Sequence, residues 1–187
     1  KRITVATYQA VSGSGATAVN ELAKQTAELL NGRDAECDVY PKQIAFNVLP
    51  HIDIFMDNGY TKEEMKMCWE TQKIFGDENI NVSATCVRVP VFFGHSEAIQ
   101  IETSDYIDEK QARGLLEKAE GVTVIDERRD GGYPTPVHES AGSDPVFVGR
   151  IRKDISLKNG LNLWVVSDNV RKGAALNSIQ IAEELIK

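Results

Sequence analysis

The stretch NVSATCVRVPVFFGHSEAIQIET, residues 81–103, predicts two β-strands joined by a short connection. Residues 82–89 and 97–103 are rich in β-branched side chains and alternate partly with period two, which is typical of strands. Pro90 and Gly94 interrupt the pattern between them. Proline cannot donate to a central hydrogen-bond ladder and glycine allows unusual backbone angles, so the chain is expected to leave the sheet here and return.

Arg88 and His95 flank this connection, seven residues apart. We expect them where one strand leaves the sheet and the next one enters it. On spacing alone, an arginine on the rim of a sheet and a surface histidine form the more frequent arrangement. A functional pair is the alternative.

Upstream, the pattern predicts a strand over residues 2–7, a loop over 9–15 and an amphipathic helix over 16–30. Asn31-Gly32 is a signal for the end of the helix, and Ser12 or Ser14 is a candidate cap at its start. The loop sequence GSG satisfies neither glycine-rich nucleotide fingerprint, so a flexible helix entry is preferred over a phosphate loop. The apolar stripe of the helix consists of Ala18, Leu22, Leu29 and Leu30.

Residues 34–54 have no regular pattern, and a helix then runs to about residue 75. Thr61 and Glu64 have the spacing of a capping box at its start. Glu63 and Lys66 project from one face of its first turns, where a solvated ion pair is the ordinary interpretation and a binding site the alternative.

Downstream, the sequence predicts a charged helix over 108–119, a short strand over 121–125 and a loop over 128–144. Strands over 146–152 and 161–167 follow, joined through the hairpin signal Asn159-Gly160, and then a helix over 171–186 with Ala174, Ala175 and Ile179 on a close-packing face. Strands and helices do not alternate regularly. The expected fold is therefore α+β, a largely antiparallel or mixed sheet with helices on one face, in a single domain over residues 1–187.

Composition excludes several classes of function. The 187 residues are 42% hydrophobic and 26% charged, with a formal net charge of −7. Nucleic-acid-binding domains present basic surface, so no nucleic-acid partner is expected. Three cysteines without a paired spacing favour neither a disulfide framework nor a zinc site, and no metal is expected. With no apolar run long enough for a membrane span and no signal peptide, we expect no membrane partner and a cytoplasmic location.

Four separated motifs resemble the C-terminal half of aspartate-β-semialdehyde dehydrogenase, in that family's order. They are TYQAVSGSG (7–15), YTKEEMKMCWETQKI (60–74), RVPVFFGHSEAIQIET (88–103) and DNVRKGAALNSIQIAEE (168–184). The resemblance implies a fold like the C-terminal domain of glyceraldehyde-3-phosphate dehydrogenase-type enzymes. It also implies a homodimer, or a dimer of dimers, assembled through the sheet of this domain.

The chemistry that the resemblance implies is the reversible reaction of L-aspartate 4-semialdehyde, phosphate and NADP to aspartyl phosphate and NADPH. A cysteine thiolate attacks the aldehyde, hydride passes to NADP, and phosphate cleaves the thioester. The products feed lysine, threonine, methionine and diaminopimelate biosynthesis. Two alternatives remain open: a related reductase of the N-acetyl-glutamyl-phosphate type, and a non-catalytic dimerisation or binding module. An N-acetylated substrate has no ammonium group for Glu63 to bind, which favours the first.

The resemblance also assigns roles to residues of this sequence. His95 matches the acid–base residue, for which an imidazole is suited. Arg88 matches the residue that binds the substrate carboxylate, where a planar bidentate donor is needed. The other matches are Glu63 for the substrate ammonium, Lys66 for phosphate, Gln9 for substrate orientation, and Ser12, Gly13 and Asn169 for contact with NADP.

The family's nucleophilic cysteine and its NADP-binding domain have no counterpart in this sequence, which begins like the middle of a protein. Cys86 lies inside a strand pattern, where a buried cysteine is the expected state, and neither Cys37 nor Cys68 has a reactive context. We therefore expect a fragment that is inactive alone and whose C-terminal helix, about 171–187, packs on the NADP-binding domain.

Overall fold

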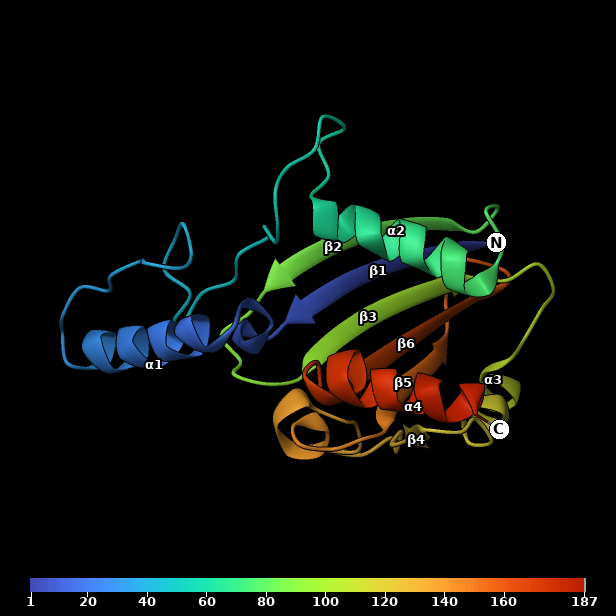
Figure 1. The fold of residues 1–187 in the computed structure, drawn as a ribbon. Coiled ribbons are helices and arrows are strands. Elements are labelled where there is room, and N and C mark those ends of the chain that lie inside the picture. Colours follow the sequence, from blue (N-terminus) through green and yellow to red (C-terminus); the bar gives the residue numbers. More distant parts are fainter. Residues whose placement is uncertain (187) are drawn as a thin grey trace.

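The computed structural model describes residues 1–186, and they form one six-stranded mixed sheet with the strand order β2-β1-β3-β6-β5-β4 (Figure 1). β1 is parallel to β2 and β4 is parallel to β5, while the other neighbours are antiparallel. The expected α+β class is confirmed. The strands are β1 (Arg2–Gln9), β2 (Asn81–Arg88), β3 (His95–Glu102), β4 (Val122–Val124), β5 (Val146–Lys153) and β6 (Gly160–Ser167).

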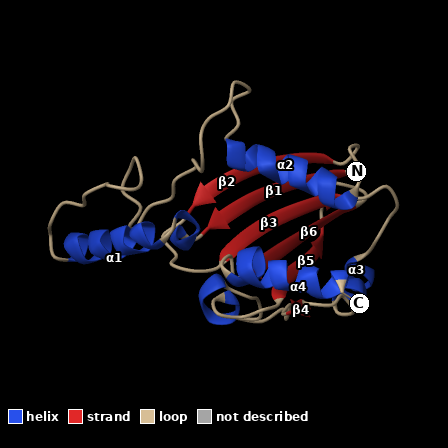
Figure 2. Ribbon diagram, in the orientation of Figure 1, coloured by secondary structure: helices blue, strands red, loops and turns tan. Residues whose placement is uncertain are grey.

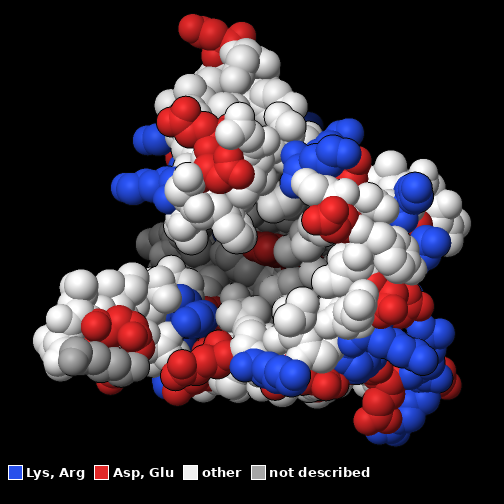
Figure 3. Space-filling view, turned by 90° about the vertical axis from the view of Figure 1, so that its right-hand side faces the viewer, with Lys and Arg blue, Asp and Glu red and all other residues white. Residues whose placement is uncertain are grey.

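Among residues 1–186, four helices accompany the sheet: α1 (Ala16–Leu30), α2 (Lys62–Phe75), α3 (Glu109–Leu116) and α4 (Leu176–Leu185). α2 and α4 both lie in front of the sheet, which confirms helices on one face (Figure 2). Viewed from the right-hand side of Figure 1, the molecule is hollowed in the middle, with mainly uncharged residues around the hollow and charged ones on its rim (Figure 3). Short helical turns precede α1 (Val11–Ser14), follow β4 (Pro136–Ser140) and precede α4 (Arg171–Ala175).

The order of the strands brings the two ends of the connection between Arg88 and His95 together. Gln9 at the end of β1 is paired with Arg88 at the end of β2, and His95 begins β3, the other neighbour of β1. The prediction that Arg88 and His95 flank an exit from the sheet is confirmed. Gly94 has a φ of 87°, and a Cβ there would lie 2.9 Å from the carbonyl oxygen of Pro136, so only glycine fits this connection.

The core has two parts. One cluster joins α1 to the irregular segment after it and contains Val11, Ala18, Leu22, Tyr40, Ile44, Ala45 and Leu49. The second packs α3 on the opposite edge of the sheet and contains Ala112, Val148, Ile151 and Leu161. In Figure 1, α1 lies beyond the strand ends and away from the sheet. The segment 31–60 returns from α1 to the sheet, where Leu49 forms a β-bridge with Arg88.

Several local predictions are confirmed. The bounds of α1 and α2 agree with the pattern, and the Thr61–Glu64 capping box is present. Gly32 at the end of α1 has a φ of 70°. α4 begins at Leu176 after an irregular turn, and its side chains are largely exposed. The predicted contact of the helix over 171–187 with another domain stays a prediction, and residue 187 lies outside the described residues.

Other local predictions are wrong. Gln9 belongs to β1 and not to the loop, because its backbone pairs with Arg88. Leu30 is 74% exposed, because in the last turn of α1 it is Leu29 that packs against the cluster with the following segment. The N-cap of α1 is Gly15 without a side-chain cap, because Ser12 bonds elsewhere. No helix among residues 1–186 is long and apolar enough to cross a membrane.

Candidate active site

The candidate site lies at one end of the sheet, where the ends of β1 and β2 meet the start of β3 and the first turns of α2. Sequence spacing alone separates these elements by tens of residues. Backbone pairing of the three strands and the packing of α2 on β2 bring them together.

Arg88 is a buried cation. Its side chain is 5% exposed, and its Nη1 donates a hydrogen bond of 2.7 Å to the carbonyl oxygen of Ala10. No carboxylate of residues 1–186 lies within ion-pair distance of it. Burial lowers the pKa of the guanidinium, yet it stays charged at neutral pH. A buried charge without a counter-ion is costly, so the site is suited to an anionic ligand.

His95 is neutral at physiological pH. Burial, and then the positive charge of Arg88, lower the pKa of its imidazole to about 4. The backbone N–H of Ala10 donates to Nδ1 over 3.1 Å. This bond assigns the ring proton of the neutral form to Nε2. In the resting state His95 is therefore a hydrogen-bond donor at Nε2, and it accepts a proton there only by exchanging tautomers.

Gly13 leaves the space next to both side chains open. A Cβ at this position would lie 3.0 Å from Nη1 of Arg88 and 3.5 Å from Nε2 of His95. Ser12 and Asn169 bond to each other, with Asn169 Nδ2 donating to Ser12 Oγ over 2.9 Å. Asn169 Oδ1 also accepts the N–H of Gly94 over 2.9 Å. The three predicted cofactor residues are thus close together, beside His95.

Gln9, Glu63 and Lys66 form one connected group. Lys66 Nζ pairs with Glu63 Oε2 at 3.0 Å, and this bond raises the pKa of Lys66. Gln9 Nε2 donates to Glu63 Oε1 over 3.3 Å. Because Gln9 ends the strand next to Arg88, this group lies beside the buried cation. The ion pair predicted as the ordinary interpretation is present, and it is part of the site.

Glu64 holds α2 in place beside this group. Its Oε2 accepts the N–H of Thr61 in the capping box, and its Oε1 accepts the N–H of Cys86 on the edge strand β2 over 3.1 Å. One carboxylate thus satisfies the start of α2 and a free donor of the sheet edge. The capping box was readable from sequence, but the contact with Cys86 was not.

None of the three cysteines has the surroundings of a nucleophile. Cys86 is fully buried, and burial raises the pKa of its thiol to about 11. Burial also raises the pKa of Cys68, and Cys37 is exposed in the segment after α1. A reactive thiol needs an electropositive, accessible setting, so the Cys68 and Cys86 thiols stay protonated at neutral pH.

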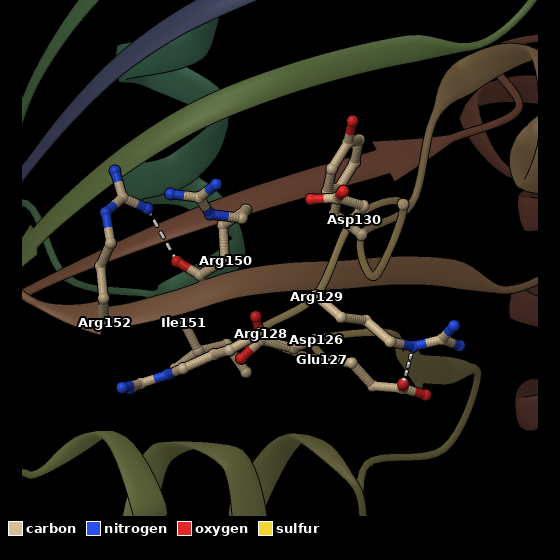
Figure 4. Close-up of a pocket in the computed structure, with 10 residues that line it drawn as sticks. Asp126, Glu127, Arg128, Arg129, Asp130, Arg150, Ile151 and Arg152 are labelled. Atoms are coloured by element: carbon tan, nitrogen blue, oxygen red, sulfur yellow. Dashed lines mark hydrogen bonds and ion pairs between the residues drawn. The ribbon is translucent and has the colours of Figure 1, made fainter.

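A separate hollow of about 700 Å³ lies between the loop after β4 and strand β5. Figure 4 shows Arg150 and Arg152 projecting to the same side of β5, and Arg129 paired with Glu127. Its lining contains none of the residues that the sequence predicted as a site. We therefore place the candidate site at the strand ends and not here.

Ala10 is the residue that sequence reasoning missed. Its carbonyl oxygen holds Arg88 and its N–H holds His95, so one backbone unit fixes both side chains. No signal in the sequence marks it, because these contacts use the backbone. Gln9, Ser12, Gly13, Glu63, Lys66, Arg88, His95 and Asn169 were all named from sequence, and the structure brings them to one end of the sheet.

Fold and site together define the class of protein: an α+β domain with a buried arginine beside a neutral imidazole at one end of its sheet. Residues 1–172 match the model of the family "Semialdehyde dehydrogenase, dimerisation domain". The chain belongs to this family.

Relatives agree with this assignment. The chain is 64% identical to the aspartate-semialdehyde dehydrogenase of Shewanella violacea, covering 100% of this chain and 54% of the relative. It is 57% identical to aspartate-semialdehyde dehydrogenase 2 of Vibrio cholerae, covering 100% of this chain and 55% of the relative. The chain spans about half the length of the curated relatives it matches.

Solved structures have the same fold. The Vibrio cholerae aspartate semialdehyde dehydrogenase II complexed with ASA superposes with a TM-score of 0.95 at 57% identity, over 99% of this chain and 54% of that one. The Candida albicans aspartate semialdehyde dehydrogenase with NADP superposes with a TM-score of 0.68 at 26% identity, over 98% of this chain and 49% of that one. The sequence-based recognition of the family is confirmed.

Proposed function

We propose that this chain is the C-terminal, substrate-binding and dimerisation half of an aspartate-semialdehyde dehydrogenase. By the full-length polypeptide we mean this chain together with the half that its relatives have in addition. The full-length polypeptide converts L-aspartate 4-semialdehyde, phosphate and NADP reversibly to L-4-aspartyl phosphate and NADPH. The observation that carries the proposal is the buried Arg88, which has no carboxylate partner among residues 1–186 and lies next to His95.

Arg88 binds the α-carboxylate of the substrate. Its guanidinium offers two parallel N–H donors to a carboxylate, and a carboxylate supplies the missing negative charge. Glu63 binds the α-ammonium group, with Gln9 orienting the carboxylate of Glu63 as it does in the resting structure. With its α-carboxylate on Arg88 and its α-ammonium on Glu63, the amino acid is held at its α-carbon, which leaves the aldehyde at the other end free to react.

Lys66 binds phosphate. In the resting structure its ammonium group neutralises Glu63. When the substrate's ammonium takes this place, Lys66 is released to bind the phosphate dianion. The side chain is 42% exposed, so it has the freedom to move. Substrate and phosphate binding are therefore coupled through one carboxylate.

His95 donates from Nε2–H to the oxygen that forms when a thiolate adds to the aldehyde. The resting tautomer already holds this proton, and Ala10 fixes the ring through Nδ1. The ring takes up or returns a proton at Nε2 only after tautomer exchange. We place the nucleophilic thiol in the other half of the polypeptide, because Cys86 is buried with a raised pKa.

NADP supplies the hydride acceptor when it is bound. The residues of this chain that would contact it are uncharged: Gly13 leaves space beside Nε2 of His95, which a Cβ would fill. Ser12 and Asn169 offer hydroxyl and amide groups at the same place. The C-terminal helix, about 171–187, packs on the half that carries the rest of the cofactor site.

The dimer forms on the face of the sheet opposite α2 and α4. Among residues 1–186, none of the helices α1 to α4 covers it, and the Tyr8 and Trp164 rings on β1 and β6 lie with centroids 5.7 Å apart. Closed two-fold dimers are the commonest oligomers. The enzyme then serves lysine, threonine, methionine and diaminopimelate biosynthesis in the cytoplasm. A dimeric mass by light scattering is expected, and a monomer at tens of micromolar would contradict this assembly.

An activity assay tests the proposal. The purified 187-residue chain should form no NADPH from semialdehyde and phosphate, because it lacks a competent thiol. The full-length polypeptide should form it, and its Cys86→Ala variant should stay active. Phosphate-dependent NADPH formation by the chain alone, or a full-length polypeptide inactive on semialdehyde, would overturn the proposal.

A further inference from the structure

Two polar atoms beside the candidate site are buried and have no hydrogen-bond partner: Nε of Arg88 and the hydroxyl oxygen of Tyr40. Tyr40 is 8% exposed and belongs to the cluster between α1 and the segment after it. Buried polar groups are almost always hydrogen-bonded, and each exception calls for an explanation. Neither atom has a role in the mechanism described above.

The fold brings these two residues together. Leu49 pairs with Arg88 through two backbone hydrogen bonds of 2.9 and 2.8 Å. Leu49 and Tyr40 are members of the same cluster. The pKa of Arg88 agrees with this arrangement: burial lowers it, and Tyr40 is the first of the groups that raise it.

Tyr40 is held firmly by its own backbone. The buried carboxylate of Glu21 in α1 accepts the N–H groups of Asp38, Val39 and Tyr40. The neighbouring Gln25 is fully buried, and its Oε1 accepts the N–H of Ile44 over 2.9 Å. The segment that carries Tyr40 is therefore anchored to α1 on both sides.

The two unpartnered atoms are complementary. Nε–H of Arg88 is a donor, and the hydroxyl oxygen of Tyr40 is an acceptor. Nη1 is already committed to Ala10 on one side and lies against Gly13 on the other. If Nε–H is committed to Tyr40, the edge formed by Nη1 and Nη2 is the one that remains for a ligand, and Gly13 and His95 lie next to that edge.

We propose that Tyr40 is a positioning residue for Arg88, whose hydroxyl oxygen accepts Nε–H when a carboxylate occupies the Nη1–Nη2 edge of the guanidinium. This rests on the proposed function, since it assumes that Arg88 binds the substrate carboxylate. α1 and the segment after it then have a purpose beyond packing: they carry the group that sets the orientation of the arginine.

Tyr40→Phe in the full-length polypeptide tests the proposal, because it removes the hydroxyl and keeps the ring. The KM for semialdehyde should rise about 5- to 50-fold, the size of a lost hydrogen bond to a charged group. The KM for phosphate and kcat should stay within about twofold. Thermal stability without substrate should be unchanged or higher, because the hydroxyl has no partner in the resting state. If Tyr40 had only a structural role, its replacement would lower the thermal stability and would not change the KM for semialdehyde differently from the KM for phosphate. Tyr106→Phe, at an exposed tyrosine, is the matched control and should change nothing.

A double-mutant cycle with Arg88→Lys separates the possible failures. Lysine has no Nε–H to donate to Tyr40, so Tyr40→Phe should change the KM for semialdehyde less than about twofold in that background. An unchanged KM in Tyr40→Phe, or the same rise with and without Arg88, would overturn the role of Tyr40 alone. An unchanged KM in Arg88→Lys itself would overturn the proposed carboxylate site.

Discussion

Replacing His95 by glutamine should make the stability of the protein less sensitive to acid. The pKa of His95 falls from 6.5 to about 4 on folding, because burial and the charge of Arg88 oppose protonation. The unfolded state therefore binds more protons between these two values, and the free energy of unfolding falls as the pH is lowered through this window. The loss grows as the pH drops below about 6.5 and is complete below about 4.

The size of the effect follows from the two pKa values. At pH 4.5 the unfolded imidazole is almost fully protonated and the folded one is mostly neutral, which costs about 2.5 kcal/mol, while at pH 7.5 the cost is close to zero. Urea unfolding at both pH values gives the free energy of unfolding. Between pH 7.5 and pH 4.5 the His95→Gln variant should lose about 2.5 kcal/mol less of this free energy than the unmodified protein. Arg88, Glu63 and Asp168 also act on this imidazole and are common to both proteins.

His138→Gln is the matched control, since that side chain is exposed, and it should keep the acid sensitivity of the unmodified protein. NMR titration of the three histidines gives an independent reading. Equal losses in the His95→Gln variant and the unmodified protein, or a His95 resonance that titrates between pH 6 and 7, would refute the reasoning about burial.

Three further outcomes are expected. A thiol reagent at pH 8 should modify the exposed Cys37 quickly and Cys86 only on unfolding, because burial raises the pKa of the Cys86 thiol to about 11. Mass spectrometry identifies the modified cysteine. Rapid labelling of Cys86 in the folded chain would contradict its burial. Thr61→Ala should lower the free energy of unfolding by about 1 kcal/mol in urea titrations, since it removes one half of a capping box, and Ser at the same position should restore it. Gly13→Ala in the full-length polypeptide should lower kcat/KM about 100-fold with unchanged thermal stability, because the new Cβ would lie 3.0 Å from Nη1 of Arg88. Full activity of this variant would mean that the substrates do not use the space beside Gly13.

The backbone pattern of this chain was largely readable from its sequence. Proline and glycine between two β-branched runs predicted where the chain leaves the sheet, and the structure has Arg88 and His95 at those positions. The Thr61–Glu64 spacing predicted the start of α2. These are local signals, which is why they needed no knowledge of the tertiary structure.

The sequence could not predict contacts that are made through the backbone or between segments far apart in the chain. Ala10 holds both Arg88 and His95 through its peptide groups, which any residue type possesses. The position of Tyr40 near Arg88 depends on how the irregular segment after α1 returns to the sheet. Leu30 fitted an amphipathic stripe, but the stripe is longer than the surface that α1 has to pack on.

The roles of the site residues were assigned by resemblance and stay predictions, and the structure adds how the side chains rest. His95 rests as a donor at Nε2, because its Nδ1 accepts the Ala10 N–H. Glu63 and Lys66 were expected to bind different groups of the substrates, and in the resting structure they bind each other. Both findings concern the state before substrate binds.

The central claim is that Arg88 binds the amino-acid substrate while Lys66 binds phosphate, and steady-state kinetics of two variants of the full-length polypeptide test it most directly. Arg88→Lys keeps the charge and loses the planar fork, so the KM for semialdehyde should rise while that for phosphate stays nearly unchanged. Lys66→Ala should raise the KM for phosphate more than that for semialdehyde. Variants that change both constants equally, or leave both unchanged, would contradict the claim.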